Sequence, residues 1–184
     1  YIHGDAADLN GDGRPDLLFT TAAKSSRFSR ISDVQRDVHL FLDSGDRDAG
    51  GMPIYLSAGR VPHPPEHWGP VRAVDLDGDG AVDLVLGSMY RDGAGPGADV
   101  SACYIRNRNP KGWPFEPAEP VIVSVGRRPC FFDVDGDGKL DSVCLVDDSR
   151  TNRFNRSSRM GWRRNLGEFP PRFAAPRVLE QVDL

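Results

Sequence analysis

The stretch Asp75-Leu-Asp-Gly-Asp-Gly-Ala-Val-Asp83 decides the fold, because the chain contains three copies of this pattern. The other two copies are Asp8-Leu-Asn-Gly-Asp-Gly-Arg-Pro-Asp16 and Asp133-Val-Asp-Gly-Asp-Gly-Lys-Leu-Asp141. Each copy has an oxygen-bearing side chain at positions 1, 3, 5 and 9 and glycine at positions 4 and 6. Glycine turns the backbone sharply without a steric penalty. We therefore predict three tight loops: loop 1 (8–16), loop 2 (75–83) and loop 3 (133–141).

Oxygen atoms that converge in a tight loop favour a hard cation. Calcium takes 6–8 oxygen ligands from carboxylates, carbonyls and water, so the spacing predicts about three calcium ions, one for each loop. The expected ligands are the side chains at positions 1, 3, 5 and 9 and the backbone carbonyl at position 7. These residues are Asp8, Asn10, Asp12, Arg14 and Asp16 in loop 1, Asp75, Asp77, Asp79, Ala81 and Asp83 in loop 2, and Asp133, Asp135, Asp137, Lys139 and Asp141 in loop 3.

The sequences around the loops predict strands rather than helices. An EF-hand requires a bidentate Glu at position 12 of its loop, whereas this chain has Phe19, Leu86 and Cys144 there. Short apolar runs follow the loops at residues 17–21, 84–87 and 142–146, and such runs between turn signals are typical of strands. Each unit is therefore predicted to begin with a β-hairpin whose turn is the cation loop.

Each unit also contains two further strand candidates. Third strands are expected at 38–42, 102–106 and 161–164, and fourth strands at 53–56, 120–123 and 176–179. Phe115 and Phe169 are read as occupying matching places in two units. Four-stranded units at an interval of about 60 residues are typical of propeller blades. The predicted fold is all-β, a β-propeller segment of about three four-stranded blades, approximately 1–67, 68–125 and 126–184, within one domain (1–184).

The three loops, together with Leu84-Val-Leu-Gly-Ser88, resemble the FG-GAP/VCBS repeats of calcium-binding β-propellers, the blade type also found in integrin α-subunit heads. The resemblance covers nearly the whole chain. It implies that the calcium loops lie on one face of a propeller and that the other long loops lie on the opposite face. Because propellers have about 4–8 blades, we expect the remaining blades or other protein chains to complete the ring.

Composition excludes some classes of function. The net charge is −4, the arginines are scattered and no basic helix is apparent, so we do not expect nucleic-acid binding. No apolar run reaches about 20 residues, so we expect no transmembrane segment.

Cys130 and Cys144 lie symmetrically about loop 3, three residues before it and three after it. A hairpin of symmetrical register would place them opposite each other. Two interpretations are open: two small core residues, or a cross-strand disulfide in an oxidising compartment.

The expected function is a binding or scaffolding module that presents loops to a protein or carbohydrate partner. Phe28, Trp68 and Tyr90 could stack on sugar rings, although packing between blades is the alternative reading. Calcium sites of extracellular modules have dissociation constants of about 10⁻⁴–10⁻³ M, which predicts an extracellular, periplasmic or cell-surface location.

Two alternative functions are open. One is a lyase or hydrolase acting on saccharides at the mouth of the propeller channel. Its candidate catalytic residues are His63, His67, Arg127 and Arg128, because histidine can transfer protons near neutral pH. The other is a structural subunit of a larger multi-chain assembly. We expect binding rather than catalysis, because nothing in the sequence brings these four side chains together.

Overall fold

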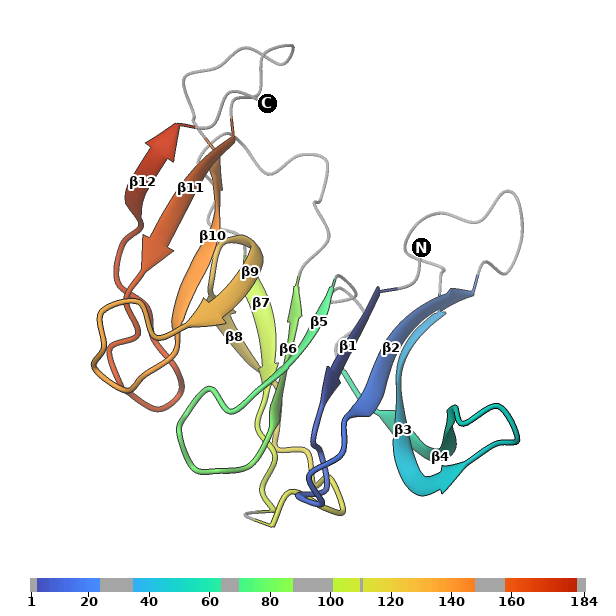
Figure 1. The fold of residues 1–184 in the computed structure, drawn as a ribbon. Helices are drawn as coiled ribbons and strands as arrows, with labels where there is room; N and C mark the ends of the chain where they lie inside the picture. The colour runs from blue at the N-terminus through green and yellow to red at the C-terminus, as the bar shows by residue number, and fades with distance from the viewer. Residues whose placement is uncertain are drawn as a thin grey trace.

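A computed structural model describes residues 3–23, 35–63, 70–87, 101–109, 111–147 and 158–181. Within these ranges the chain forms strands and no helix, which confirms the all-β prediction. Consequently, none of the described residues forms a helix that could cross a membrane. The strands make three four-stranded antiparallel sheets, and each sheet follows chain order. The sheets stand side by side and do not close into a ring (Figure 1).

The strand bounds agree with the repeat read from the sequence. Sheet 1 contains β1 (His3–Ala7), β2 (Asp16–Ala23), β3 (Gln35–Arg47) and β4 (Pro53–Val61). Sheet 2 contains β5 (Val71–Val74), β6 (Asp83–Gly87), β7 (Ser101–Ile105) and β8 (Val121–Ser124). Sheet 3 contains β9 (Arg127–Phe132), β10 (Asp141–Asp147), β11 (Ser158–Arg163) and β12 (Arg177–Gln181).

The cation loops are the turns of the first hairpin in each sheet. They connect β1 to β2, β5 to β6 and β9 to β10. In loop 2, Gly78 and Gly80 have φ angles of 77° and 89°, which residues with a side chain rarely adopt. The glycines at positions 4 and 6 of the other two loops also have positive φ. The repeated glycines are therefore explained by the backbone of the turn.

Strand β6 of sheet 2 packs against neighbouring sheets on both of its faces, which explains why it has apolar residues at consecutive positions. Leu84 and Leu86 belong to a core cluster shared with sheet 1, and Val85 belongs to a second cluster that packs against residues of sheet 3. Side chains alternate between the two faces of a strand, so an uninterrupted apolar run serves two interfaces. All five residues of β6 are buried.

The loop between the third and fourth strands of a sheet covers the cation loop of the preceding sheet. Leu9, at position 2 of loop 1, is 1 % exposed, and Trp113 and Phe115 pack against its cluster. Leu76, at position 2 of loop 2, is 3 % exposed, and Phe173 packs against its cluster. In contrast, Val134 at position 2 of loop 3 is 44 % exposed. Burial at position 2 therefore depends on a following sheet.

Backbone hydrogen bonds show that Phe115 and Phe169, which the sequence analysis matched, do not occupy equivalent positions. Ala118 donates its N–H to the carbonyl of Arg106, and Ala174 donates its N–H to the carbonyl of Arg164. These equivalent bonds place Trp113, rather than Phe115, at the position of Phe169. The prediction was wrong because the two loops differ in length before the aromatic residue.

No disulfide joins Cys130 and Cys144. Cys130 is exposed and stands opposite Val143, because the hairpin pairs Phe132 with Asp141, one residue away from the symmetrical register. An offset of one residue places two side chains on opposite faces of the sheet. Cys144 is buried, so the structure supports the core interpretation for Cys144 alone.

We predict that Leu76→Ala lowers the free energy of unfolding by about 2–4 kcal/mol, because it removes buried methyl groups and leaves a cavity between sheets 2 and 3. Val134→Ala is the matched control at the same loop position, and its exposed side chain predicts a change within about 0.5 kcal/mol. Denaturant unfolding in the presence of a chelator measures both. Equal effects of the two substitutions would contradict the interface described here.

Candidate metal centre

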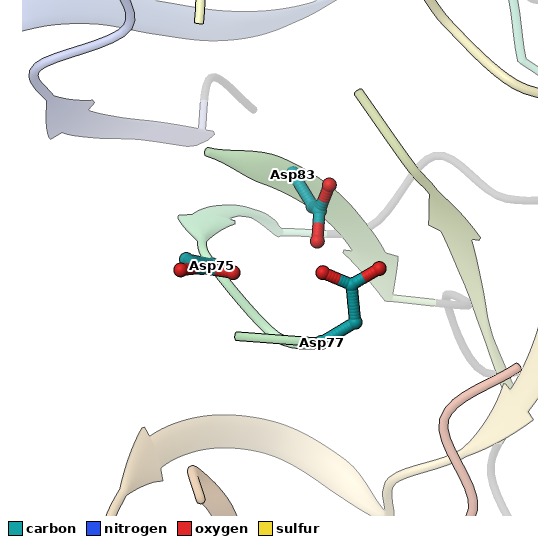
Figure 2. A group of neighbouring side chains, drawn as sticks. All are labelled: Asp75, Asp77 and Asp83. Atoms are coloured by element: carbon teal, nitrogen blue, oxygen red, sulfur yellow. The ribbon is translucent and has the colours of Figure 1, made fainter. Parts of the chain in front are cut away.

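Three carboxylates converge in each of loops 2 and 3. Asp75, Asp77 and Asp83 each offer an oxygen atom, and these atoms lie within 4.8 Å of one another. Figure 2 shows the carboxylates of Asp77 and Asp83 facing each other across loop 2, with Asp75 at the third side. The same arrangement occurs in loop 3 with Asp133, Asp135 and Asp141. Both clusters could hold a metal ion, and their oxygen-only donors suit a hard cation.

Loop 1 differs from the other two loops at position 3. Asn10 stands where loops 2 and 3 have an aspartate, so loop 1 does not offer the same three carboxylates. The Asn10 side chain is engaged within the loop: its Nδ2 donates to Asp12 Oδ2 at 2.8 Å, and its Oδ1 accepts the Asp12 N–H at 3.1 Å. Loop 1 therefore has one less negative charge among the predicted ligands.

The aspartate at position 1 organises the backbone of each loop. In loop 2, Asp75 Oδ1 accepts the N–H of Gly78 at 2.8 Å, and Asp75 Oδ2 accepts the N–H of Gly80 at 2.9 Å. The same two bonds run to Asp133 in loop 3, and in loop 1 Asp8 accepts the N–H of Gly13. A carboxylate has about four lone-pair sites, so these bonds leave capacity for an ion. The loop thus folds around the first predicted ligand.

The aspartate at position 9 ties the loop to the rest of its sheet. Asp83 is fully buried and accepts three hydrogen bonds: from the backbone N–H of Leu76 (3.3 Å), the backbone N–H of Asn107 (2.8 Å) and the hydroxyl of Tyr104 (2.8 Å). In loop 3, Asp141 accepts from Val134, Asn165 and the indole of Trp162.

Loop 1 has only two of these three bonds. Asp16 accepts the N–H groups of Leu9 and Asp43, at 2.9 and 2.8 Å. Leu40 stands where the other sheets have Tyr104 and Trp162, so its side chain has no donor to offer. Position 9 is therefore held by protein donors in all three loops, and most fully in loops 2 and 3.

Burial makes the charge at position 9 unfavourable when no cation is present. Loss of solvent raises the pKa of Asp83 to about 7, although its hydrogen bonds from Asn107 and Tyr104 act in the opposite direction. Burial also raises the pKa of Asp16. Burial, followed by the charge of Asp83, raises the pKa of Tyr104, so its hydroxyl stays protonated and remains a donor. A bound cation would favour the charged carboxylate, so these residues fit a cation site.

The residues at positions 5 and 7 do not belong to the two carboxylate clusters. The position-5 side chains of Asp12, Asp79 and Asp137 pair with arginine or lysine side chains. The hydrogen bond from Lys139 is the main cause that lowers the pKa of Asp137. At position 7, Arg14, Ala81 and Lys139 donate their backbone N–H groups to the position-5 aspartates. Metal ligation at positions 5 and 7 stays a prediction.

Sequence reasoning missed one residue near the end of the third strand of each sheet. Asp43, Asn107 and Asn165 each donate a backbone N–H to the position-9 aspartate at 2.8 Å. The side-chain Oδ1 of each accepts the N–H of the residue two positions later, which fixes the turn. The repeated pairs Arg106-Asn107 and Arg164-Asn165 were the available signal.

The catalytic role of the four candidate residues stays a prediction. His63 follows β4 and is partly buried, whereas His67 lies outside the described residues. Arg128 is exposed and has a φ of 50°, and the side chain of its neighbour Arg127 is outside the described part of the chain. The loop aromatics Phe28, Trp68 and Tyr90 are also outside the described residues.

We predict that Asp83→Ala lowers the free energy of unfolding by at least about 2 kcal/mol in the presence of a chelator. The substitution leaves the donors of Leu76, Asn107 and Tyr104 buried without their acceptor, and each such loss is costly. Asp79→Ala is the control in the same loop; its ion pair is partly exposed, so a change within about 1 kcal/mol is expected. Denaturant unfolding measures both, and a smaller effect at Asp83 than at Asp79 would contradict the role of position 9.

We also predict that the calcium-free protein becomes less stable as the pH rises from about 4 to about 7. In this range native Asp83 holds a proton that the unfolded chain has released, because its pKa is raised from 3.8 to about 7. The raised pKa of Asp16 acts in the same direction, and the lowered pKa of His3 opposes it below pH 6.5.

The measurement is the free energy of unfolding against pH, with chelator and with excess calcium. Asp83→Asn should flatten the profile in chelator, and calcium should flatten it in the unmodified protein, because the ion favours the charged carboxylate. Stability that rises with pH across this range in chelator would contradict the assignment to Asp83.

Comparison with known protein families matches residues 8–86, and again residues 75–144, to the FG-GAP-like repeat. Each match spans two consecutive cation loops, and together they cover more than half of the chain. Comparisons with curated proteins and with solved structures gave no match. The repeated loops, the three four-stranded sheets and the family match agree, and the chain belongs to the FG-GAP-like repeat family.

Proposed function

We propose that the chain is a calcium-stabilised segment of a β-propeller that serves as an extracytoplasmic binding or scaffolding module. The observation that carries this proposal is the pair of carboxylate clusters, Asp75–Asp77–Asp83 and Asp133–Asp135–Asp141, within repeats of the FG-GAP-like family. Family membership supports a propeller-like binding module.

Calcium is the proposed ion because the donor set consists of oxygen atoms. Zinc sites use histidine and cysteine, and the two clusters contain neither. Magnesium requires near-ideal octahedral geometry and usually keeps several waters, whereas calcium accepts many carboxylates in flexible geometry. The ion would neutralise carboxylates that the loop brings together. We propose about three ions, with the site of loop 1 the weakest because Asn10 supplies no charge.

The calcium has a structural role in this proposal. Each loop joins two strands, and loops 1 and 2 also contact the following sheet, as the burial of Leu9 and Leu76 indicates. An ion that fixes the loop would therefore stabilise a hairpin and an interface at once. The three sheets, each in simple chain order, would be consecutive blades. Remaining blades or other protein chains would complete the ring beyond the exposed side of sheet 3, where Phe132 and Val134 are uncovered.

A protein is the proposed partner, because FG-GAP-like repeats are generally protein-interaction modules that occur in extracellular proteins. Loops on a rigid β scaffold are suitable recognition surfaces. Calcium sites with dissociation constants of about 10⁻⁴–10⁻³ M would be filled outside a cell and largely empty in the cytosol. No described residue supports a carbohydrate site or the saccharide-acting alternative.

Calcium titration tests this proposal. Isothermal titration calorimetry and native mass spectrometry should show about three calcium ions per chain, with dissociation constants of about 10⁻⁴–10⁻³ M. At 10 mM calcium each filled site should add roughly 1–3 kcal/mol to the free energy of unfolding. Equal concentrations of magnesium should have a smaller effect.

Two variants locate the sites. Asp75→Ala and Asp133→Ala should each remove one bound calcium ion. Asp46→Ala is the control, because this acidic residue lies in β3, outside the three loops. Absence of calcium binding at 10 mM, or loss of binding in the control alone, would overturn the proposal.

A further inference from the structure

Arg106 and Arg164 bridge two predicted ligands in their own loops. Arg106 Nε lies 2.6 Å from Asp77 Oδ2, and Arg106 Nη2 lies 2.6 Å from Asp79 Oδ2. The contact to Asp77 is an ion pair without an aligned hydrogen bond, whereas the contact to Asp79 is a hydrogen bond. Arg164 repeats the arrangement in loop 3, at 2.8 Å from Asp135 and 3.0 Å from Asp137. Each guanidinium therefore joins positions 3 and 5.

The arginine occurs only in the sheets whose loops carry an extra carboxylate. Loops 2 and 3 have aspartate at position 3, and an arginine directly follows the third strand, one residue before Asn107 or Asn165. Loop 1 has Asn10 at position 3, and Leu42 stands at the equivalent place before Asp43. The position-5 carboxylate of loop 1 pairs instead with Arg14 of the same loop. The guanidinium thus offsets the charge that position 3 adds.

The ion pair of Arg106 with Asp77 is partly shielded from solvent. The side chain of Asp77 is only 8 % exposed. The guanidinium carbon of Arg106 also lies 4.9 Å from the ring centroid of Phe169, a residue of the loop that follows β11 in the next sheet. Ion pairs with reduced access to water interact more strongly than exposed ones. These contacts therefore hold the Arg106 side chain in a defined position beside loop 2.

We propose that Arg106 and Arg164 are positioning residues that act as internal counter-cations for loops 2 and 3. They hold the carboxylates at positions 3 and 5 together when no metal is bound, and they weaken calcium binding by the same contacts. This inference rests on the proposed calcium sites. It adds that the chain's own arginines set the affinity of those sites.

The physical reason is that the guanidinium and the ion use the same carboxylates. Without metal, the carboxylates that loop 2 brings together repel one another, and Arg106 offsets that repulsion at Asp77 and Asp79. When calcium binds, the guanidinium becomes a like charge near the ion, and like charges repel. The arginine therefore narrows the difference in stability between the metal-free and metal-bound loops.

The test isolates loop 2 in a background that carries Asp8→Asn and Asp133→Asn, which disables the other two proposed sites. Calorimetry measures the calcium dissociation constant, and thermal unfolding in chelator measures the stability of the metal-free protein. Arg106→Leu, which copies Leu42 of sheet 1, should tighten calcium binding about three- to tenfold. It should also lower the melting temperature in chelator.

Three control variants separate charge from other effects. Arg108→Leu removes the same charge from an exposed position two residues away and should change calcium affinity by less than about twofold. Phe169→Ala removes the ring contact without changing any charge and should have an equally small effect on affinity. Arg106→Lys keeps the charge but loses the two-pronged contact, so affinity should stay near that of the background while the melting temperature in chelator falls.

The outcomes distinguish this inference from the proposed function. If the background binds no calcium, the proposed site in loop 2 is wrong and the inference falls with it. If the background binds calcium but Arg106→Leu binds it equally or more weakly, the counter-cation role is wrong and the calcium site stands. Should Arg106→Leu fail to fold, Arg164→Leu in a background with only loop 3 intact decides between the same results.

Discussion

The buried carboxylate at position 9 of each loop is the interaction on which the rest of the structure depends. Asp83 accepts hydrogen bonds from its own loop, from Tyr104 in the third strand and from Asn107 just beyond that strand. It therefore joins the loop to a segment that lies 21 to 24 residues further along the chain. A buried carboxylate is tolerated only when it is well paired, and a cation on the open side of the loop would complete that pairing. Local turn geometry, sheet assembly and the proposed metal site thus share one side chain.

A second constraint is that position 2 of a cation loop is buried by the following sheet and not by its own sheet. The cover for Leu9 and Leu76 comes from the following sheet, through Trp113, Phe115 and Phe173. Repeat units of this kind gain stability from their neighbours rather than singly. Arg106 extends this dependence to charge, because it contacts both its own loop and Phe169 of the next sheet. Through Arg106, loop 2 is therefore in physical contact with the next sheet.

Sequence reasoning located the three loops, the strands beside them and the two carboxylate clusters. It succeeded because glycine and aspartate act within nine residues, and short-range spacing carries over directly into local geometry. It failed where the answer depended on register or on a partner from another segment. The hairpin of β9 and β10 pairs Phe132 with Asp141, one residue away from the symmetrical register, so Cys130 stands opposite Val143 and not Cys144. The ion pairs of Arg106 could not be predicted from the sequence, because Arg106 comes close to loop 2 only after the sheet has formed.

The sequence by itself determined the repeat, the all-β class, the turns at the cation loops and the choice of oxygen ligands. These properties follow from residue types at fixed short spacing, where backbone φ angles and side-chain reach allow few alternatives. Only the tertiary structure decided which carboxylates converge, which are paired with arginine, and which loop residues are buried. Those outcomes depend on contacts between segments far apart in the chain, so Leu76 is buried and Val134 exposed although both occupy position 2 of the same motif.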